Sequence, residues 1–290
     1  MSTSSSERLE VRTALSGTPL ARRHEQTLGG KLARIPKALP WSAFRASEHP
    51  RAALALATDF WLGLARGEYG AVGLFSKIAT AMTAAGAPFD LVYAATVASA
   101  DETRHAEYAL RMASLSHGKE ATLSLDPAAF EAHLTPLAND EELDLALINA
   151  VAISETLATA LLTACQRRAT DRLSKSLLTA VLSDEVHHAR LGWYYLAHRA
   201  PQWTTAERQR LADAAAEVVV GVEEEFWVGR DAPKSASTGA RALGVLDSKS
   251  QRAVIRDVME NEILPGLDAL GFGASRAWPL RRPGKPRARR

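Results

Sequence analysis

Two five-residue segments decide the fold of this chain. Residues 101–105 read Asp-Glu-Thr-Arg-His, and residues 184–188 read Asp-Glu-Val-His-His. On an α-helix, a Glu and a His three residues apart lie on one face about one turn from each other, so both can bind one metal ion. The carboxylate stays able to bridge to a second ion. The repeated pattern therefore predicts two helices that each supply a Glu and a His to a shared metal site.

A further glutamate precedes each segment by the length of a helical hairpin. Glu68 lies 34 residues before Glu102, and Glu155 lies 30 residues before Glu185. In an antiparallel hairpin the two members of each pair come level, so that four helices contribute ligands at one depth of a bundle. The candidate metal ligands are Glu68, Glu102, His105, Glu155, Glu185 and His188.

The neighbours of these glutamates bear on the alternative interpretation, which is surface ion pairs and two ordinary histidines. The residues that share a helix face with Glu68, such as Trp61 and Phe75, are apolar, and so are those that share a face with Glu155, such as Val151. A carboxylate in the middle of an apolar stripe is costly unless it is paired or bound to a metal. These stripes favour the metal site.

Long Ala- and Leu-rich segments, separated by short breaks with Pro, Gly or Asp, predict the helices. We expect long helices over 51–85, 89–116, 140–168 and 172–198, outer helices over 205–228 and 248–270, and a loop over 232–242. Two short links and one longer connection give two antiparallel hairpins joined by a crossover. The predicted fold class is all-α, a four-helix bundle with two additional C-terminal helices.

Composition limits the class of protein. The chain has 290 residues, of which 47% are hydrophobic and 23% charged, as in soluble globular proteins. The single cysteine, Cys165, excludes a disulfide framework and a Cys-rich zinc or iron–sulfur site. Because no run of eighteen uncharged apolar residues occurs, we expect no membrane span. The Ser-rich residues 1–10 contain no apolar segment, so we expect no secretory signal and a cytoplasmic location.

Charge and proline content divide the chain into three parts. Residues 1–50 read as an extended N-terminal arm, 51–271 as the helical domain and 272–290 as a basic tail. Residues 276–290 contain seven basic residues and no acidic one. The rest of the chain has 28 basic and 33 acidic residues, a net charge of about −5. A basic tail can contact nucleic acid, but such ends are more often solvated, so we expect no nucleic-acid partner.

The two motifs resemble the di-iron centres of the ferritin-like superfamily, which includes bacterial multicomponent monooxygenases, ribonucleotide reductase small subunits, rubrerythrins, arylamine N-oxygenases and a tRNA hydroxylase. The resemblance covers roughly residues 51–200. It implies a ferritin-like bundle with two iron ions, or manganese in their place. Glu68 with His105, and Glu155 with His188, would be terminal ligands of one ion each, while Glu102 and Glu185 would bridge.

The resemblance also assigns roles around the ligands. Asp101 would orient His188, and Asp184 would orient His105. Thr159 stands where the monooxygenases carry a threonine that faces the oxygen-binding pocket, although a helical threonine can also merely pack. Some N-oxygenases carry a third histidine at the position of Val181, which counts against that subgroup. His187, rotated by about 100° from His188, is expected outside the ligand set.

The resemblance predicts a non-haem di-iron oxygenase that uses O₂ to hydroxylate or otherwise oxidise a small organic substrate. The sequence has neither a dinucleotide glycine fingerprint nor a Cys cluster, so electrons would come from a separate ferredoxin or reductase. An iron-oxidising or peroxide-scavenging protein and a tRNA hydroxylase remain alternatives, and a homodimer is possible. Four glycines in the first helix, Gly63, Gly67, Gly70 and Gly73, fit either close helix packing or a cavity beside the metals.

Overall fold

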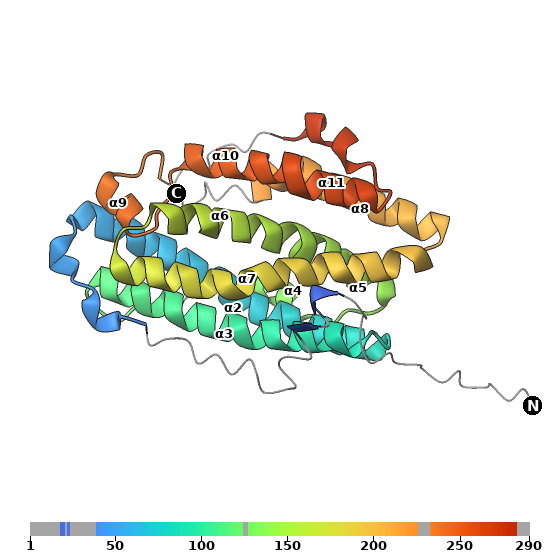
Figure 1. Ribbon diagram of the computed structural model, residues 1–290, viewed down its shortest axis with the longest axis horizontal. Helices are drawn as coiled ribbons and strands as arrows, with labels where there is room; N and C mark the ends of the chain where they lie inside the picture. Colours follow the sequence, from blue (N-terminus) through green and yellow to red (C-terminus); the bar gives the residue numbers. More distant parts are fainter. Residues whose placement is uncertain (1–17, 21, 24–38, 124–126, 226–232, 283–290) are drawn as a thin grey trace, which may run out of the picture.

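The computed structural model describes residues 18–20, 22–23, 39–123, 127–225 and 233–282. Among these residues every regular element is helical and none is a strand, which confirms the predicted all-α class. Four long helical rods lie alongside one another, with shorter helices covering one side (Figure 1).

The four rods follow the predicted ranges closely. The third is one uninterrupted rod made of three consecutive elements, with a π-helical turn in its middle. The elements are α2 (Arg51–Ala84), α3 (Phe89–His117), α5 (Asp140–Ala146), the π-helical η3 (Leu147–Ile153), α6 (Ser154–Arg168) and α7 (Arg172–Arg199).

Local chemistry explains where these rods begin and end. Pro50 and Pro88 directly precede α2 and α3 and provide the extended backbone from which each helix starts. Gly118 ends α3 with φ of 78°, a conformation that glycine adopts without strain. The Asp171 side chain accepts the backbone N–H of Ser174 and caps α7.

The outer layer consists of α8 (Thr205–Glu225) and a second rod with a π-helical turn, which packs against α6. This rod comprises α10 (Ser248–Val258), the π-helical η6 (Met259–Ile263) and α11 (Leu264–Ala269). The predicted loop over 232–242 is wrong at its end, because Thr238–Ala242 form a short helix, α9, capped by the Ser237 hydroxyl. A further short helix, α4 (Pro127–Leu134), lies in the crossover and packs against α2.

Residues 272–282, which the sequence interpretation assigned to the tail, pack against the helical body. Phe272 and Trp278 are both only 8% exposed, and the Trp278 indole N–H donates to Glu260 at 2.9 Å. The backbone N–H of Arg282 donates to the Val220 carbonyl of α8. Packed structure therefore continues to Arg282, and the rest of the basic tail lies outside the described residues.

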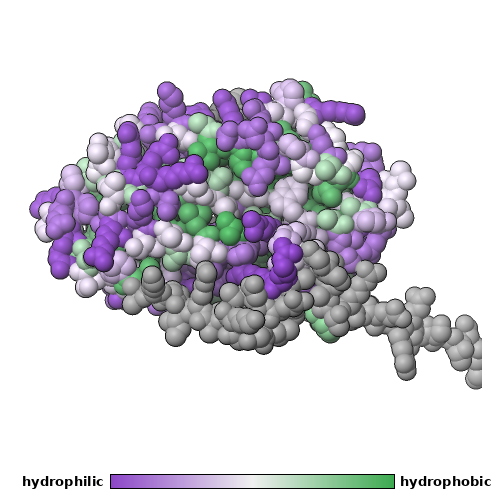
Figure 2. Space-filling view, viewed as in Figure 1, coloured by the Kyte–Doolittle hydropathy of each residue, from purple (hydrophilic) through white to green (hydrophobic). Residues whose placement is uncertain are grey.

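One rod, Asp140–Arg168, is long and apolar enough to cross a membrane by length and composition. It is nevertheless partly buried between other helices and carries Glu155 in its interior face, as the core helix of a soluble protein does. The face shown in Figure 2 is largely hydrophilic, with smaller apolar patches between the charged groups. These observations are consistent with a soluble protein, and the cytoplasmic location stays a prediction.

Candidate metal centre

The structure brings all six predicted ligands together in the middle of the four rods. Glu68 comes from α2, Glu155 from α6, and the two Glu–His pairs come from α3 and α7. All six are buried. Their exposed fractions are 9% for Glu68, 0% for Glu102, 0% for His105, 9% for Glu155, 1% for Glu185 and 3% for His188.

Two overlapping groups of possible metal ligands can be drawn within this cluster. Ligand atoms of Glu68, Glu102, His105 and Glu185 lie within 4.8 Å of one another, and so do those of Glu102, Glu155, Glu185 and His188. Glu102 and Glu185 belong to both groups. This sharing is the geometry expected of two neighbouring ions bridged by two carboxylates.

The two imidazoles face the shared glutamates through their Nδ1 atoms. His105 Nδ1 lies 3.0 Å from Glu185 Oε1 and 3.5 Å from Glu102 Oε2. His188 Nδ1 lies 2.9 Å from Glu102 Oε1 and 3.4 Å from Glu185 Oε2. Each glutamate thus contacts both histidines, and the two halves of the site mirror each other.

The opposite nitrogen of each ring faces an aspartate from the other motif. His105 Nε2 is 3.3 Å from Asp184 Oδ2, and His188 Nε2 is 3.4 Å from Asp101 Oδ2. Ionised carboxylates accept hydrogen bonds, so each Nε2 carries the proton and donates it, which leaves the Nδ1 lone pair for a metal. The structure pairs Asp101 and Asp184 with the histidines that the resemblance implies; their effect on a bound metal stays a prediction.

Arg104 is a residue that the sequence analysis missed. Its guanidinium NH2 nitrogen donates to Asp101 Oδ1 at 2.6 Å and to Asp184 Oδ2 at 2.8 Å. One cation therefore joins the two aspartates that orient the two histidines. The sequence feature that could have identified Arg104 is its place as the fourth residue of the first motif, directly before the ligand His105.

Burial and charge act oppositely on the histidines. Burial disfavours the imidazolium, yet the carboxylates of Asp184, Glu102 and Glu185 raise the pKa of His105 well above its usual value. The pKa of His188 is raised in the same way by Asp101, Glu102 and Glu185. Without metal, the two rings are therefore protonated partners of the carboxylates.

The four glutamates divide into two pairs. Burial is the main reason why the pKa of Glu68 lies well above its ordinary range, and repulsion from Glu102 and Glu185 raises it further. The pKa of Glu155 is raised in the same way, first by burial and then by repulsion from Glu185 and Glu102. Burial would also raise the pKa of Glu102 and Glu185, but contact with both histidines lowers it. The two shared glutamates are thus the carboxylates held ionised at the centre.

The residues present fit a pair of divalent cations. Both carboxylate oxygens of Glu102 and of Glu185, and the Nδ1 atoms of His105 and His188, are buried without a properly directed hydrogen bond. Buried polar atoms of this kind call for a partner. Two divalent cations would displace the Nδ1 protons, balance the four glutamate charges and take these buried atoms as ligands.

Three further residues of the sequence analysis lie on α6 and α7. The Thr159 hydroxyl, one turn after Glu155, is buried and makes no hydrogen bond. Val181 is 1% exposed and so occupies a core position before Glu185. His187 is only half-buried, and it belongs to neither group of possible ligands within the part of the chain that the structure describes.

The four glycines of α2 divide between the two interpretations. A Cβ on Gly73 would lie 2.9 Å from Leu134, so this glycine allows α4 to pack closely, whereas one on Gly70 would meet the His133 ring at 3.5 Å, an ordinary contact. A Cβ on Gly63 or Gly67 would meet nothing within 4 Å. Close packing thus explains Gly73 but not the other three glycines.

The π-helical turn η3 ends directly before the helix that carries Glu155. A Cβ on Gly192 of α7 would lie 2.5 Å from the Ala152 backbone nitrogen, so α7 packs against this turn at a distance that leaves no room for a side chain. A π turn changes the rotation of the residues that follow it, and such turns occur frequently at functional sites. The sequence predicts a regular helix over 140–168, without this π turn.

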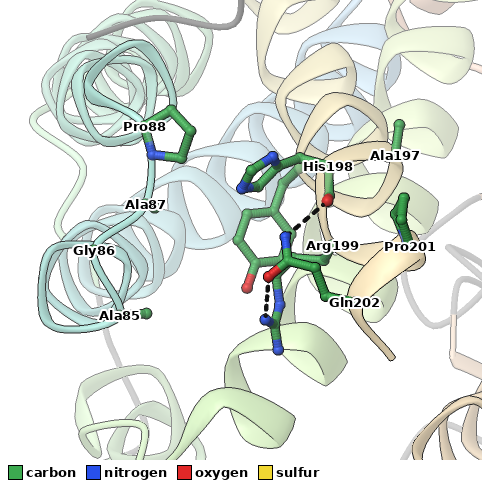
Figure 3. Close-up of a pocket in the computed structure, with 10 residues that line it drawn as sticks. Ala85, Gly86, Ala87, Pro88, Ala197, His198, Arg199, Pro201 and Gln202 are labelled. Carbon is green, nitrogen blue, oxygen red and sulfur yellow. Dashed lines mark hydrogen bonds between the residues drawn. The ribbon is translucent and has the colours of Figure 1, made fainter. Parts of the chain in front are cut away.

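A hollow of about 580 Å³, drawn in Figure 3, lies at one end of the bundle, and none of the six candidate ligands lines it. It lies between the turn at 85–88 and the end of α7 at 197–202. The Arg199 guanidinium beside it is held by Asp144, which also accepts hydrogen bonds from Tyr195 at 2.9 Å and Trp203 at 2.7 Å. Polar groups here satisfy one another, so the metal-ligand cluster remains the candidate functional site.

No protein-family model, no curated protein and no solved structure matches this chain. The interpretation of the site therefore rests on the ligand geometry, burial and charge described above.

Proposed function

We propose that the chain is a ferritin-like protein that binds two iron ions between its four long helices and oxidises a small organic substrate with O₂. The observation that carries this proposal is the sharing of Glu102 and Glu185 between two groups of four ligand residues. The mirrored contacts of His105 and His188 with both shared glutamates support two equivalent ion positions.

The donor set favours a reactive pair of ions. Carboxylate and imidazole ligands without thiolate suit non-haem iron, with manganese as the competitor. Six protein side chains leave open coordination positions on two ions, whereas a structural site is closed by protein ligands. When bound, such a pair would reduce O₂ and so provide the oxidant for hydroxylation, N-oxygenation or desaturation.

The residues of the chain would prepare the site in three ways. Asp101 and Asp184 hold the proton on Nε2 of each histidine, which directs Nδ1 inward. Burial of the cluster keeps bulk water away from the shared glutamates. Glu68 and Glu155, whose pKa values are raised, can take up or release protons at the edge of the site. Electrons would enter from a separate ferredoxin or reductase.

The test combines metal analysis with oxygen consumption. Loading with Fe(II) under anaerobic conditions should give two iron ions per chain, and O₂ added with a chemical reductant and a substrate panel should be consumed beyond the amount of iron. One bound ion, or zinc alone, would contradict the proposal. Iron oxidation that stops at the stoichiometry of the metal, with every substrate unchanged, would favour the iron-oxidising or peroxide-scavenging alternative.

A truncated chain separates the tRNA hydroxylase alternative. Because packed structure continues to Arg282, a chain ending there keeps every described contact while losing the last basic residues. Iron binding and oxygen consumption should be unchanged. Salt-sensitive tRNA binding by the full chain that disappears together with activity in the truncated chain would favour the RNA enzyme instead.

A further inference from the structure

Two buried polar atoms on one side of the metal ligands lack a hydrogen-bond partner. Trp61 is fully buried, and its Nε1 atom has no acceptor; the buried Thr159 hydroxyl has no partner either. By contrast, the indole N–H groups of Trp193, Trp203 and Trp278 donate to side-chain oxygens at 3.1, 2.7 and 2.9 Å. A buried N–H without an acceptor is costly and requires an explanation.

The Thr159 hydroxyl is also exceptional within its own helix. Thr156 and Thr163 each donate to the backbone carbonyl four residues earlier, at 2.6 and 2.7 Å. Thr159 makes no such bond. Its hydroxyl is therefore not used to satisfy the backbone of α6, and it remains available to a molecule in the core.

Trp61 and Thr159 lie towards the same end of the bundle. Asp101 faces His188 while Asp184 faces His105, so α3 and α7 are antiparallel; α2 and α6 are the antiparallel hairpin partners of these helices. Residues before Glu68 in α2 and after Glu155 in α6 consequently lie on one side of the ligands. Trp61 is two turns from Glu68, about 10 Å along the axis, and Thr159 is one turn from Glu155.

Some of the side chains on the Trp61 side of the ligands are small, although larger ones such as Leu162 and Leu178 belong to the same cluster. Ala65, Ala109 and Val181 are buried there and belong to the same apolar cluster as Trp61. On the opposite side, Phe75 stands two turns after Glu68 and packs directly on the His188 ring, with centroids 5.3 Å apart. An aromatic ring therefore contacts a ligand histidine directly on the Phe75 side, whereas Ala65 and Ala109 lie within two turns of the ligands on the Trp61 side.

We propose that the organic substrate binds on the Trp61 side, between the metal ligands and the indole ring. The Trp61 N–H would donate to an acceptor oxygen of the substrate, and the Thr159 hydroxyl would contact the part nearer the metals. Many apolar side chains pack around Trp61, so a charged group there would lose its hydration at a high cost. The substrate class is a compact neutral molecule of about one ring with a carbonyl or ether oxygen at one end.

This inference rests on the proposed function for its location, but binding can be tested without O₂ chemistry. Acetophenone and α-methylstyrene have the same shape and differ in a carbonyl oxygen against a methylene group. Titration of each into the ¹⁵N-labelled chain, metal-free and with Zn(II), reports on the Trp61 indole N–H resonance. We expect acetophenone to bind about tenfold more tightly than α-methylstyrene and to shift that resonance downfield.

Matched variants show which residue distinguishes acetophenone from α-methylstyrene. Trp61→Phe keeps a buried ring and should reduce the affinity ratio of the two compounds to about one. Trp193→Phe, which removes an indole N–H that already has an acceptor in Thr156, should leave the ratio unchanged. Thr159→Val should weaken both compounds by about the same factor, while preserving the Trp61 shift, and unchanged affinities would show that the hydroxyl does not contact the bound molecule.

Several results would contradict the proposed substrate pocket. Equal affinity of the two compounds in the unsubstituted chain would do so, and this comparison does not depend on any variant folding. So would an unshifted Trp61 resonance at saturation, or a long-lived water that stays on the N–H when acetophenone is bound. Two bound iron ions without ligand discrimination would overturn the pocket alone, whereas discrimination in a chain that binds no iron would overturn the proposed function alone.

Discussion

The motif on α3 and the motif on α7 supply the same ligands, yet they are supported differently. Arg104 of the first motif donates to the aspartates of both motifs. The matching position of the second motif is His187, which is half-buried and is not among the possible metal ligands of the described residues. The ligands are thus duplicated, whereas the cation that compensates the two aspartates is supplied once.

The helices that bring the other two glutamates differ as well. Glu68 lies in α2, an α-helix without interruption over Arg51–Ala84. Glu155 follows the π-helical turn Leu147–Ile153, which Gly192 allows α7 to approach closely. The first hairpin therefore positions its glutamate by regular helical geometry, and the second does so by a local change of helical rotation.

The largest effect is expected from removing a shared glutamate. Glu102→Ala or Glu185→Ala takes one ligand from both groups, so both ions should be lost, with affinity reduced more than about 100-fold, beyond the range of changes around the ligands. Glu68→Ala or Glu155→Ala takes a ligand from one group only and should leave about one ion. Metal analysis after dialysis distinguishes the cases. Equal losses in Glu102→Ala and Glu68→Ala would show that the glutamates are not shared.

Metal affinity should increase with pH. The pKa values of His105, His188, Glu68 and Glu155 are all raised in the metal-free chain, so metal binding must displace protons from this cluster. Between about pH 6 and pH 8, affinity should rise by up to about tenfold per pH unit for each proton released. Calorimetry in buffers of different ionisation enthalpy measures the released protons, and pH-independent binding would contradict the protonated cluster.

Unfolding of the metal-free chain should show the opposite dependence. A histidine whose folded pKa is raised contributes stability that is fully present below its ordinary value of 6.5 and is lost as the pH rises through the folded pKa. The metal-free chain should therefore lose thermal stability as the pH rises above 6.5, and the raised pKa values of Glu68 and Glu155 add a loss in the same direction that begins above 4.5. The lowered pKa values of Glu102 and Glu185 act at lower pH, outside this window.

Arg104 provides the sharpest comparison of the two motifs. Arg104→Gln leaves both aspartates without their cation and should weaken metal binding about 10–100-fold, as other changes beside metal ligands do. His187→Gln changes the matching position of the second motif and should have no comparable effect. Arg104→Lys keeps the charge but not the planar guanidinium, so partial rescue is expected. Metal titration of the three variants tests this, and equal losses in Arg104→Gln and His187→Gln would contradict the asymmetry.

Sequence reasoning could predict what repeats with helical periodicity. The i, i+3 spacing of Glu102 and His105 places both on one helix face, and the hairpin spacing places Glu68 level with them. Arg104 was missed because its second partner, Asp184, is 80 residues away, and a basic residue inside a helix is usually a surface group.

Other features carry no periodic signal at all. The π turn over Leu147–Ile153 reads as an apolar helical run like any other, and only its packing against Gly192 distinguishes it. The packing of residues 272–282 depends on Trp278, which reaches Glu260 and stacks under the Arg281 guanidinium at 4.3 Å. The contacts of Trp278 with Glu260 and of Gly192 with the π turn join residues that no local pattern relates.

The smallest effect concerns two glycines, one in each hairpin. A Cβ on Gly67 of α2 would meet nothing within 4 Å, and alanine is favoured over glycine in a helix by up to about 1 kcal/mol. Gly67→Ala should therefore raise the free energy of unfolding of the metal-free chain by up to about 1 kcal/mol.

Gly192 should respond with the opposite sign. The Cβ of an alanine there would lie 2.5 Å from the backbone nitrogen of Ala152 and 2.8 Å from its Cα, and backbone atoms cannot rotate away. Overpacking of this kind costs about 1–3 kcal/mol, more than the helical preference of alanine returns. Urea unfolding of both variants measures the two changes. A neutral Gly192→Ala would mean that α7 is not seated against the π turn, and the proposed difference between the two hairpins would then be lost.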